Sequence, residues 1–169
     1  MIILSIITTI ISLLIQGTVS NYIGYTYENL SVFSTIYVLI SLLVVKPHFE
    51  NEKKYLILLI SFGLMIDITY TSTFLLNTCL FIIVYYFTKA FHFFVPYNLF
   101  TINASNLLSI FLYHIISFLF LTILQYDQYT IWTLIKILTN SIIMTIIYTS
   151  ILYFFIETLK NKLELKNVK

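Results

Sequence analysis

The sequence contains no arginine, a single cysteine and few charged residues of either sign. Charged residues make up 9% of the 169 residues, against about a quarter in soluble domains, whereas 60% of the residues are hydrophobic. This composition excludes an ordinary soluble domain, and the mean hydropathy of +0.97 indicates an integral membrane protein. The net charge of +2 is too small to indicate binding to nucleic acid.

The same absences argue against catalysis. Cys79 is the only cysteine, which excludes an internal disulfide and a metal site built from several cysteines. A membrane serine hydrolase would need a nucleophile in a glycine-flanked turn, and no Gly-x-Ser-x-Gly is present. Transfer of a phosphate group would need clustered acids with a metal, or basic clamps, and the acids here are scattered. We therefore expect a protein that is not an enzyme and needs no cofactor or metal.

Six apolar runs, separated by polar residues or by proline and glycine, predict six transmembrane helices in a single polytopic domain, residues 1–169. A span needs about 20 mostly apolar residues, so the chain has room for these helices and no soluble domain. The runs cover residues roughly 2–20, 30–45, 55–71, 74–95, 104–125 and 131–157, and residues 158–169 are predicted to form a helical cytoplasmic tail.

The distribution of the lysines along the chain predicts how the protein is oriented in the membrane. Eight of the nine fall between the second and third runs, at the end of the fourth run, or in the tail: Lys46, Lys53, Lys54, Lys89, Lys160, Lys162, Lys166 and Lys169. Only Lys136 falls toward the other side. The positive-inside rule therefore places both termini in the cytoplasm, which agrees with an even number of helices.

A lone carboxylate, Asp67, lies inside the third apolar run. An acid at membrane depth costs roughly 2.5 kcal/mol or more unless it has a partner. Asn77 lies about as far from the polar break at 71–73 as Asp67 does, so its amide would donate to the carboxylate across a tight hairpin. His114, in the fifth run, is a second candidate partner. The favoured interpretation is a polar clamp that locks the helices, and a proton relay, ion relay or ligand anchor is the alternative.

Gln16, in the first run, is a further polar group at membrane depth. Three interpretations are open for it: membership of the Asp67 cluster, an interhelical hydrogen bond of roughly 1 kcal/mol, or a local bond to backbone or to the lipid interface.

The residues around Asp67 resemble a family signature, Gly-Leu-x-x-Asp followed ten residues later by Asn. This chain has Gly63-Leu64-Met65-Ile66-Asp67, with Asn77 at that offset. Leu14-Ile15-Gln16 resembles a Leu-Gln near the end of the family's first helix, and Asn29-Leu30 resembles the start of its second. The chain thus resembles the bacterial rod shape-determining protein MreD family, whose members have a similar length and about six apolar helices.

The chain departs from that family at three positions. The family often has glycines where this chain has Thr71 and Leu75, and a proline where it has Glu28. Because glycine permits close approach of backbones, the hairpin here is expected to be looser or differently packed.

The resemblance implies an all-α membrane fold similar to the S components of energy-coupling-factor transporters. It also implies a non-catalytic scaffold subunit of the cell-elongation machinery in the bacterial cytoplasmic (inner) membrane. Such a subunit would contact membrane lipid, bind an MreC-like bitopic protein, associate with MreB, RodA and its penicillin-binding transpeptidase, and support lateral peptidoglycan synthesis.

The similarity to S components supplies a second hypothesis, the substrate-binding subunit of a transporter for a vitamin or other small molecule. S components carry small residues, typically Ala-x-x-x-Ala, on the face of helix one that docks the transport module. The first run here, Ile2–Ser20, has no alanine, and Ser5 and Ser12 on one face are a weak match. This shortage favours the scaffold hypothesis.

Overall fold

The structure is a computed structural model, and it describes residues 2–22, 36–49, 51–71, 75–123 and 130–167. The described residues form six α-helices and two short helical segments, with no strand among them. The helices are α1 (Ile2–Tyr22), α2 (Tyr37–Val45), α3 (Glu52–Ile66), α4 (Leu76–Phe94), α5 (Leu99–Ile123) and α6 (Ile131–Asn167), with a 3₁₀-helix η1 (Lys46–His48) and a π-helical segment η2 (Asp67–Thr71).

These helices follow the six predicted runs, but their lengths differ. Three helical segments are long and apolar enough to cross a membrane, Leu76–Phe94, Leu99–Phe120 and Ile131–Lys160. The apolar parts of α1 and α2 in the described chain, Ile3–Thr18 and Tyr37–His48, are shorter. The all-helical fold is therefore confirmed for the described residues, and three helices are compatible with a membrane protein, while a six-span topology stays a prediction. Residues 30–35, the beginning of the predicted second helix, lie outside the described residues.

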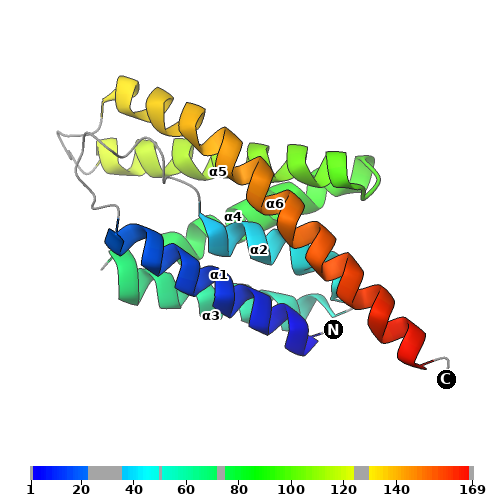
Figure 1. Ribbon diagram of the computed structural model, residues 1–169. Helices are drawn as coiled ribbons and strands as arrows, with labels where there is room; N and C mark the ends of the chain where they lie inside the picture. The colour runs from blue at the N-terminus through cyan, green and yellow to red at the C-terminus, as the bar shows by residue number, and fades with distance from the viewer. Residues whose placement is uncertain (1, 23–35, 50, 72–74, 124–129, 168–169) are drawn as a thin grey trace.

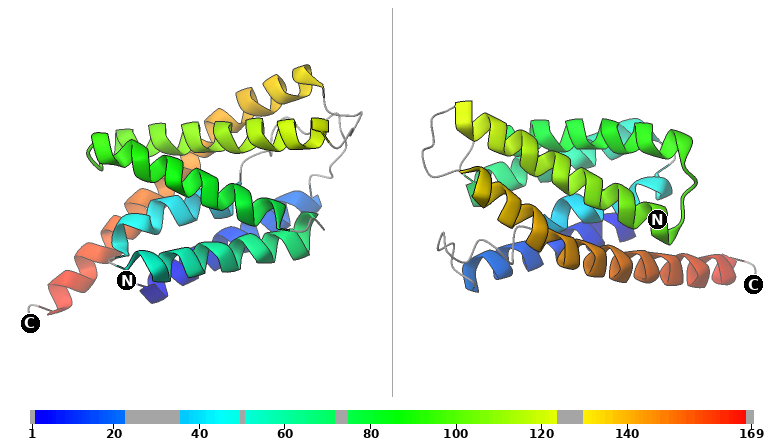
Figure 2. Two further views of the ribbon diagram at one scale, coloured as in Figure 1. Left: turned by 180° about the vertical axis from the view of Figure 1, so that it is seen from behind. Right: turned by 90° about the horizontal axis from the view of Figure 1, so that it is seen from above.

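The first and last helices place both ends of the described chain at the same end of the bundle (Figures 1 and 2). We call this end, where α2 also ends and α3 begins, the inner end, following the orientation predicted from the lysines. At 37 residues, α6 is about 55 Å long, well beyond the roughly 30 Å of a bilayer core. Its last turns project past the other helices (Figure 1), and the predicted helical tail is confirmed as far as Asn167.

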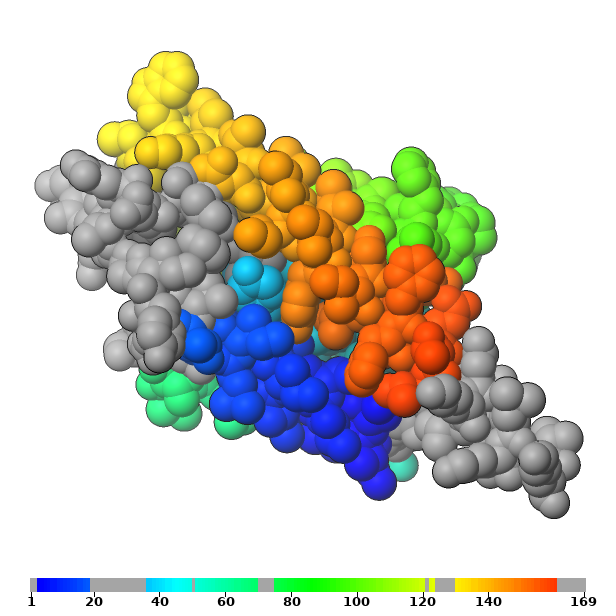
Figure 3. Space-filling model, viewed as in Figure 1, coloured from blue at the N-terminus to red at the C-terminus, as the bar shows by residue number. Residues whose placement is uncertain are grey.

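The short helix α2 forms the centre of the bundle. All nine of its residues are buried, and on the face shown in Figure 3 it lies between α1 and α6. Carbonyls at the end of a buried helix need donors, because neither lipid nor core supplies them. The Tyr55 hydroxyl donates to the Leu42 carbonyl at 3.0 Å, and the Tyr97 hydroxyl donates to the Leu43 carbonyl at 3.1 Å. Two tyrosines thus cap the C-terminal end of α2.

Helix α5 begins at Leu99, five residues before the predicted run, because Asn98 caps it. The Asn98 side chain accepts the Thr101 N–H at 2.9 Å, and the Thr101 hydroxyl accepts the Asn98 N–H at 3.0 Å. Such reciprocal bonds are typical of a helix N-terminus.

Small polar residues line a buried face of α6, and one of them forms a hydrogen bond with α5. Ser141, Thr145 and Thr149 are fully buried and recur every four residues, so they share one face of α6. Small side chains permit close contact of membrane helices, and polar ones add hydrogen bonds across the contact. The Asn106 amide of α5 donates to the Thr149 hydroxyl at 3.2 Å. The polar pattern in this part of the chain therefore marks a helix contact.

Candidate functional site

Asp67 lies at the junction of α3 and η2, and its side chain is only 2% exposed. Its N–H donates to the carbonyls of Gly63 and Leu64, four and three residues earlier, and the π-helical segment η2 begins at this residue. The π-helical turn η2 is a candidate functional position, because single π-helical turns are frequent at functional sites.

The carboxylate of Asp67 accepts four hydrogen bonds from the beginning of α4. One oxygen, Oδ1, accepts the Asn77 backbone N–H and the Asn77 side-chain amide, both at 2.9 Å. The other, Oδ2, accepts the Thr78 N–H at 3.0 Å and the Thr78 hydroxyl at 2.8 Å. The contact predicted between the Asn77 amide and the Asp67 carboxylate is thus confirmed, and Thr78 adds to it.

These bonds make Asp67 the cap of a helix to which it does not belong. The first N–H groups of a helix have no intrahelical acceptor, and a local Ser, Thr, Asp or Asn normally supplies one. The residue at that position in α4 is Leu75, whose side chain makes no capping bond. Asp67 supplies both the acceptors and a negative charge at the positive end of the α4 dipole.

Gly63 makes this capping possible by bringing two helices close together. A Cβ placed on Gly63 would lie 2.8 Å from the Thr78 Cα and 3.0 Å from the Thr78 hydroxyl, closer than Cβ atoms come to other atoms. The α3 and α4 backbones therefore approach each other in a way that only glycine permits. The expected loosening of the hairpin is not found at this contact, and residues 72–74 of the turn lie outside the described residues.

Tyr113 connects the cluster to a third helix, α5. Its hydroxyl donates to the Asn77 side-chain oxygen, and its ring packs near Phe81, with centroids 6.2 Å apart. We refer to Gly63, Asp67, Asn77, Thr78 and Tyr113 as the Asp67 clasp.

The sequence interpretation placed His114, one residue further along α5, as the candidate partner at this depth. In the structure it is Tyr113 that bonds to Asn77, and the half-buried His114 ring lies edge-on to the Tyr113 ring, with centroids 5.4 Å apart. The predicted depth along α5 agrees with the position of Tyr113, and a contact between His114 and Asp67 stays a prediction. Tyr113 was missed because it is one of 14 tyrosines, and no sequence pattern distinguishes it from the others.

Gln16 takes part in a different contact. Its side-chain oxygen accepts the Val38 N–H of α2 at 3.3 Å. Val38 lies in the first turn of α2, and the preceding Ile36 makes no side-chain capping bond. Of the three interpretations open for Gln16, the structure supports the interhelical hydrogen bond, which here caps α2 from α1.

The Asp67 carboxylate is chemically saturated. Two carboxylate oxygens offer about four lone-pair sites, and Asp67 directs all four at donors of α4. A proton relay or a ligand anchor needs a lone pair that becomes available, so this geometry favours a structural clamp.

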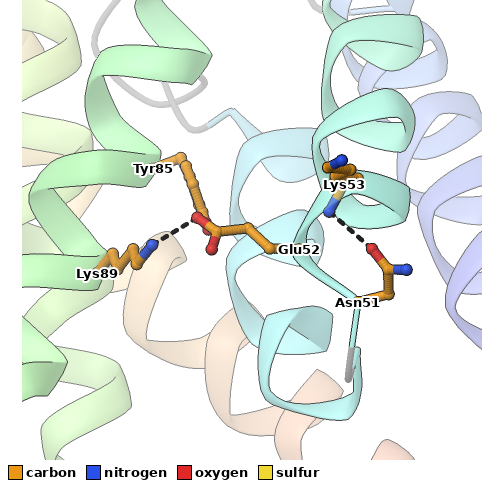
Figure 4. Close-up of polar contacts among 5 residues, drawn as sticks. All are labelled: Asn51, Glu52, Lys53, Tyr85 and Lys89. Carbon is orange, nitrogen blue, oxygen red and sulfur yellow. Dashed lines mark hydrogen bonds and ion pairs between the residues drawn. The ribbon is translucent and has the colours of Figure 1, made fainter.

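A second polar cluster lies at the inner end of the bundle (Figure 4). Glu52, the first residue of α3, accepts hydrogen bonds at one oxygen from Lys89 at 2.5 Å and from the Tyr85 hydroxyl at 2.7 Å. These bonds, that from Lys89 most of all, lower the pKa of the Glu52 carboxyl. Asn51 caps the same helix, since its side-chain oxygen accepts the Lys53 N–H at 3.0 Å.

No family model, curated protein or solved structure matches this chain. A family assignment therefore depends on the chain's own residues and their geometry.

Proposed function

We propose that this chain is a non-catalytic membrane scaffold subunit of the bacterial cell-elongation machinery. It would bind an MreC-like bitopic protein in the inner membrane and support lateral peptidoglycan synthesis together with MreB, RodA and its penicillin-binding transpeptidase. The observation that carries this proposal is the Asp67 clasp: the signature residues Asp67 and Asn77 form hydrogen bonds with each other, and the signature glycine, Gly63, permits the close approach of α3 to Thr78 in α4.

The chemistry of the clasp supports a scaffold. All four acceptor sites of Asp67 serve to dock α4 on α3, and Tyr113 extends the contact to α5. A carboxylate engaged in this way stabilises one arrangement of three helices, and a stable arrangement is what a protein that presents helix faces to partners needs.

The backbone at Leu75, where the family often has glycine, also supports the resemblance. Leu75 has φ +59° and ψ +6°, the left-handed conformation, and it is the only described non-glycine residue with positive φ. Glycine adopts this conformation without strain, whereas a branched side chain resists it. The family's frequent glycine at this position thus suits the backbone found here.

The transporter hypothesis is less well supported. Its docking surface would be the small-residue face of α1, which includes Ser5 and Ser12. Both side chains are at most 3% exposed in the bundle, and the Ser12 hydroxyl lies 2.7 Å from the Tyr148 hydroxyl of α6. A transport module could not reach this face unless α1 moved away from α6.

Co-purification tests the proposal. The tagged chain, extracted in mild detergent, should retain a single-span MreC-like protein from the same cells, while an unrelated single-span membrane protein should be lost. Reproducible failure to retain the partner, together with retention of a vitamin or similar small molecule, would overturn the scaffold function in favour of the transporter subunit.

A further inference from the structure

The inner end of the bundle holds two lysines around one tyrosine ring. The Lys46 ammonium lies over the Tyr85 ring, 5.2 Å from its centroid. At the hydroxyl end of the ring, Tyr85 donates to Glu52, and the same carboxylate oxygen accepts from Lys89 at 2.5 Å. The ring and the carboxylate therefore lie between two cations from different parts of the chain, one in η1 and one in α4.

This cluster of side chains carries an excess positive charge. Lys46, Lys89 and Glu52 together carry a net charge of +1, since one carboxylate serves two ammonium groups. Burial and then the nearby charge of Lys89 lower the pKa of Lys46, so the two cations are close enough to repel each other. An anion bound at the exposed side of the two lysines would relieve this repulsion.

The surroundings of the two lysines indicate which anion fits. Lys89 and Glu52 remain about half exposed, with side chains 47% and 46% accessible, so a ligand can reach them. From Lys89 toward the membrane centre, Tyr86 and Ile83 continue the same exposed face of α4, at 52% and 46% exposure. A cationic group at the membrane surface that continues into an exposed apolar face is complementary to a lipid, with its phosphate at the lysines and its acyl chain along the helix.

We propose that Lys46 and Lys89 form a binding site for the phosphate group of an anionic phospholipid in the inner leaflet. A phosphodiester headgroup carries one negative charge, which neutralises the excess charge of the site. A soluble phosphate shares the charge chemistry but has no acyl chain for the Tyr86 and Ile83 face. The proposal does not depend on the scaffold function, because it concerns the lipid around the protein.

Lipid binding to the purified full-length chain tests this site. Native mass spectrometry in an uncharged detergent would compare bound phosphatidylglycerol with bound phosphatidylcholine. The double variant Lys46→Gln/Lys89→Gln should bind phosphatidylglycerol about 25-fold more weakly, since each lysine near an anionic headgroup contributes roughly fivefold. The matched control, Lys53→Gln/Lys54→Gln, removes the same charge from two exposed lysines of α3 and should change binding by less than about twofold.

Three results would overturn the proposal. Equal weakening in the two double variants would show a diffuse charge effect, and equal binding of the two lipids by the unaltered chain would show no recognition of the anionic headgroup. Displacement of phosphatidylglycerol by millimolar inorganic phosphate, or by an acidic peptide, with the same dependence on Lys46 and Lys89, would assign the site to a soluble anion or to a protein partner. Circular dichroism of each variant confirms that it is folded.

Discussion

Replacement of Asp67 distinguishes a structural clasp from a charge-dependent site. In Asp67→Leu the carboxylate acceptors are lost, and the buried N–H groups of Asn77 and Thr78 lose the bonds that α4 cannot replace. A buried backbone donor without an acceptor costs about 1–3 kcal/mol, so the two together cost roughly 4 kcal/mol. Loss of the negative charge at the beginning of α4 adds about 0.3–1 kcal/mol.

Asp67→Asn should be milder than Asp67→Leu. Asparagine has the same shape and keeps one acceptor oxygen, so the backbone N–H of either Asn77 or Thr78 stays bonded. The new NH₂ group of asparagine then faces the donors of the other residue. We therefore expect a loss of roughly 2 kcal/mol, about half of that for leucine. The measurement is the free energy of unfolding in mixed micelles, from titration with a denaturing detergent followed by circular dichroism.

A matched control lies two turns away on the same helix. Ser61 is exposed, and its hydroxyl bonds only to the Ile57 carbonyl within α3, so Ser61→Ala should change stability by less than about 0.5 kcal/mol. A loss of less than about 1 kcal/mol in Asp67→Leu would refute the capping argument. Equal losses in the Asn and Leu variants, both still folded, would show that charge itself is needed and would favour the relay or ligand interpretation.

Four further predictions concern other contacts. Gly63→Ala should destabilise the protein by about 1–3 kcal/mol in the same unfolding assay, because the added Cβ meets Thr78, and an unchanged stability would refute the close approach. Leu75→Gly should raise stability by about 1 kcal/mol, since it removes the strain of a left-handed leucine, and destabilisation would contradict this. Tyr55→Phe removes the side-chain donor of the Leu42 carbonyl, which then keeps only the Lys46 N–H, and should cost about 0.5–1.5 kcal/mol, with the melting temperature in micelles as the measurement. The Glu52 carboxyl has a folded-state pKa below its usual 4.5, so its stabilising effect is present above that pH and is lost as the pH falls through the lowered value. Melting curves of Glu52→Gln should therefore converge with those of the unaltered chain at acidic pH, and a constant gap from pH 6 to pH 3 would contradict the ion pair.

Much of the secondary structure could be predicted because the lipid imposes it. Apolar runs long enough to cross the bilayer core must be helical, and polar or Pro/Gly residues separate them. Helix α6 follows the predicted run 131–157 closely and continues along the predicted tail. The beginning of α5 was predicted five residues late, because Asn98 acts through a local cap, which hydropathy does not register.

The partner of Asp67 was predictable only in part. Asn77 could be found because two arms of a short hairpin place residues at equal distance from the turn at equal depth, and that depth follows from counting. Tyr113 could not be chosen over His114 by counting, since successive residues on a helix differ by about 100° in direction.

Hydropathy and spacing thus predict, from the chain alone, apolar helices that can cross a membrane and a buried acid that needs donors. Only the tertiary structure decides that those donors are the first N–H groups of α4, that Gly63 brings them within reach, and that α2 is capped by side chains from other parts of the chain. The physical reason is that hydropathy depends on each residue's own transfer from water to lipid. A hydrogen bond depends on the distance and rotation of two helices, which the packing of the whole bundle sets.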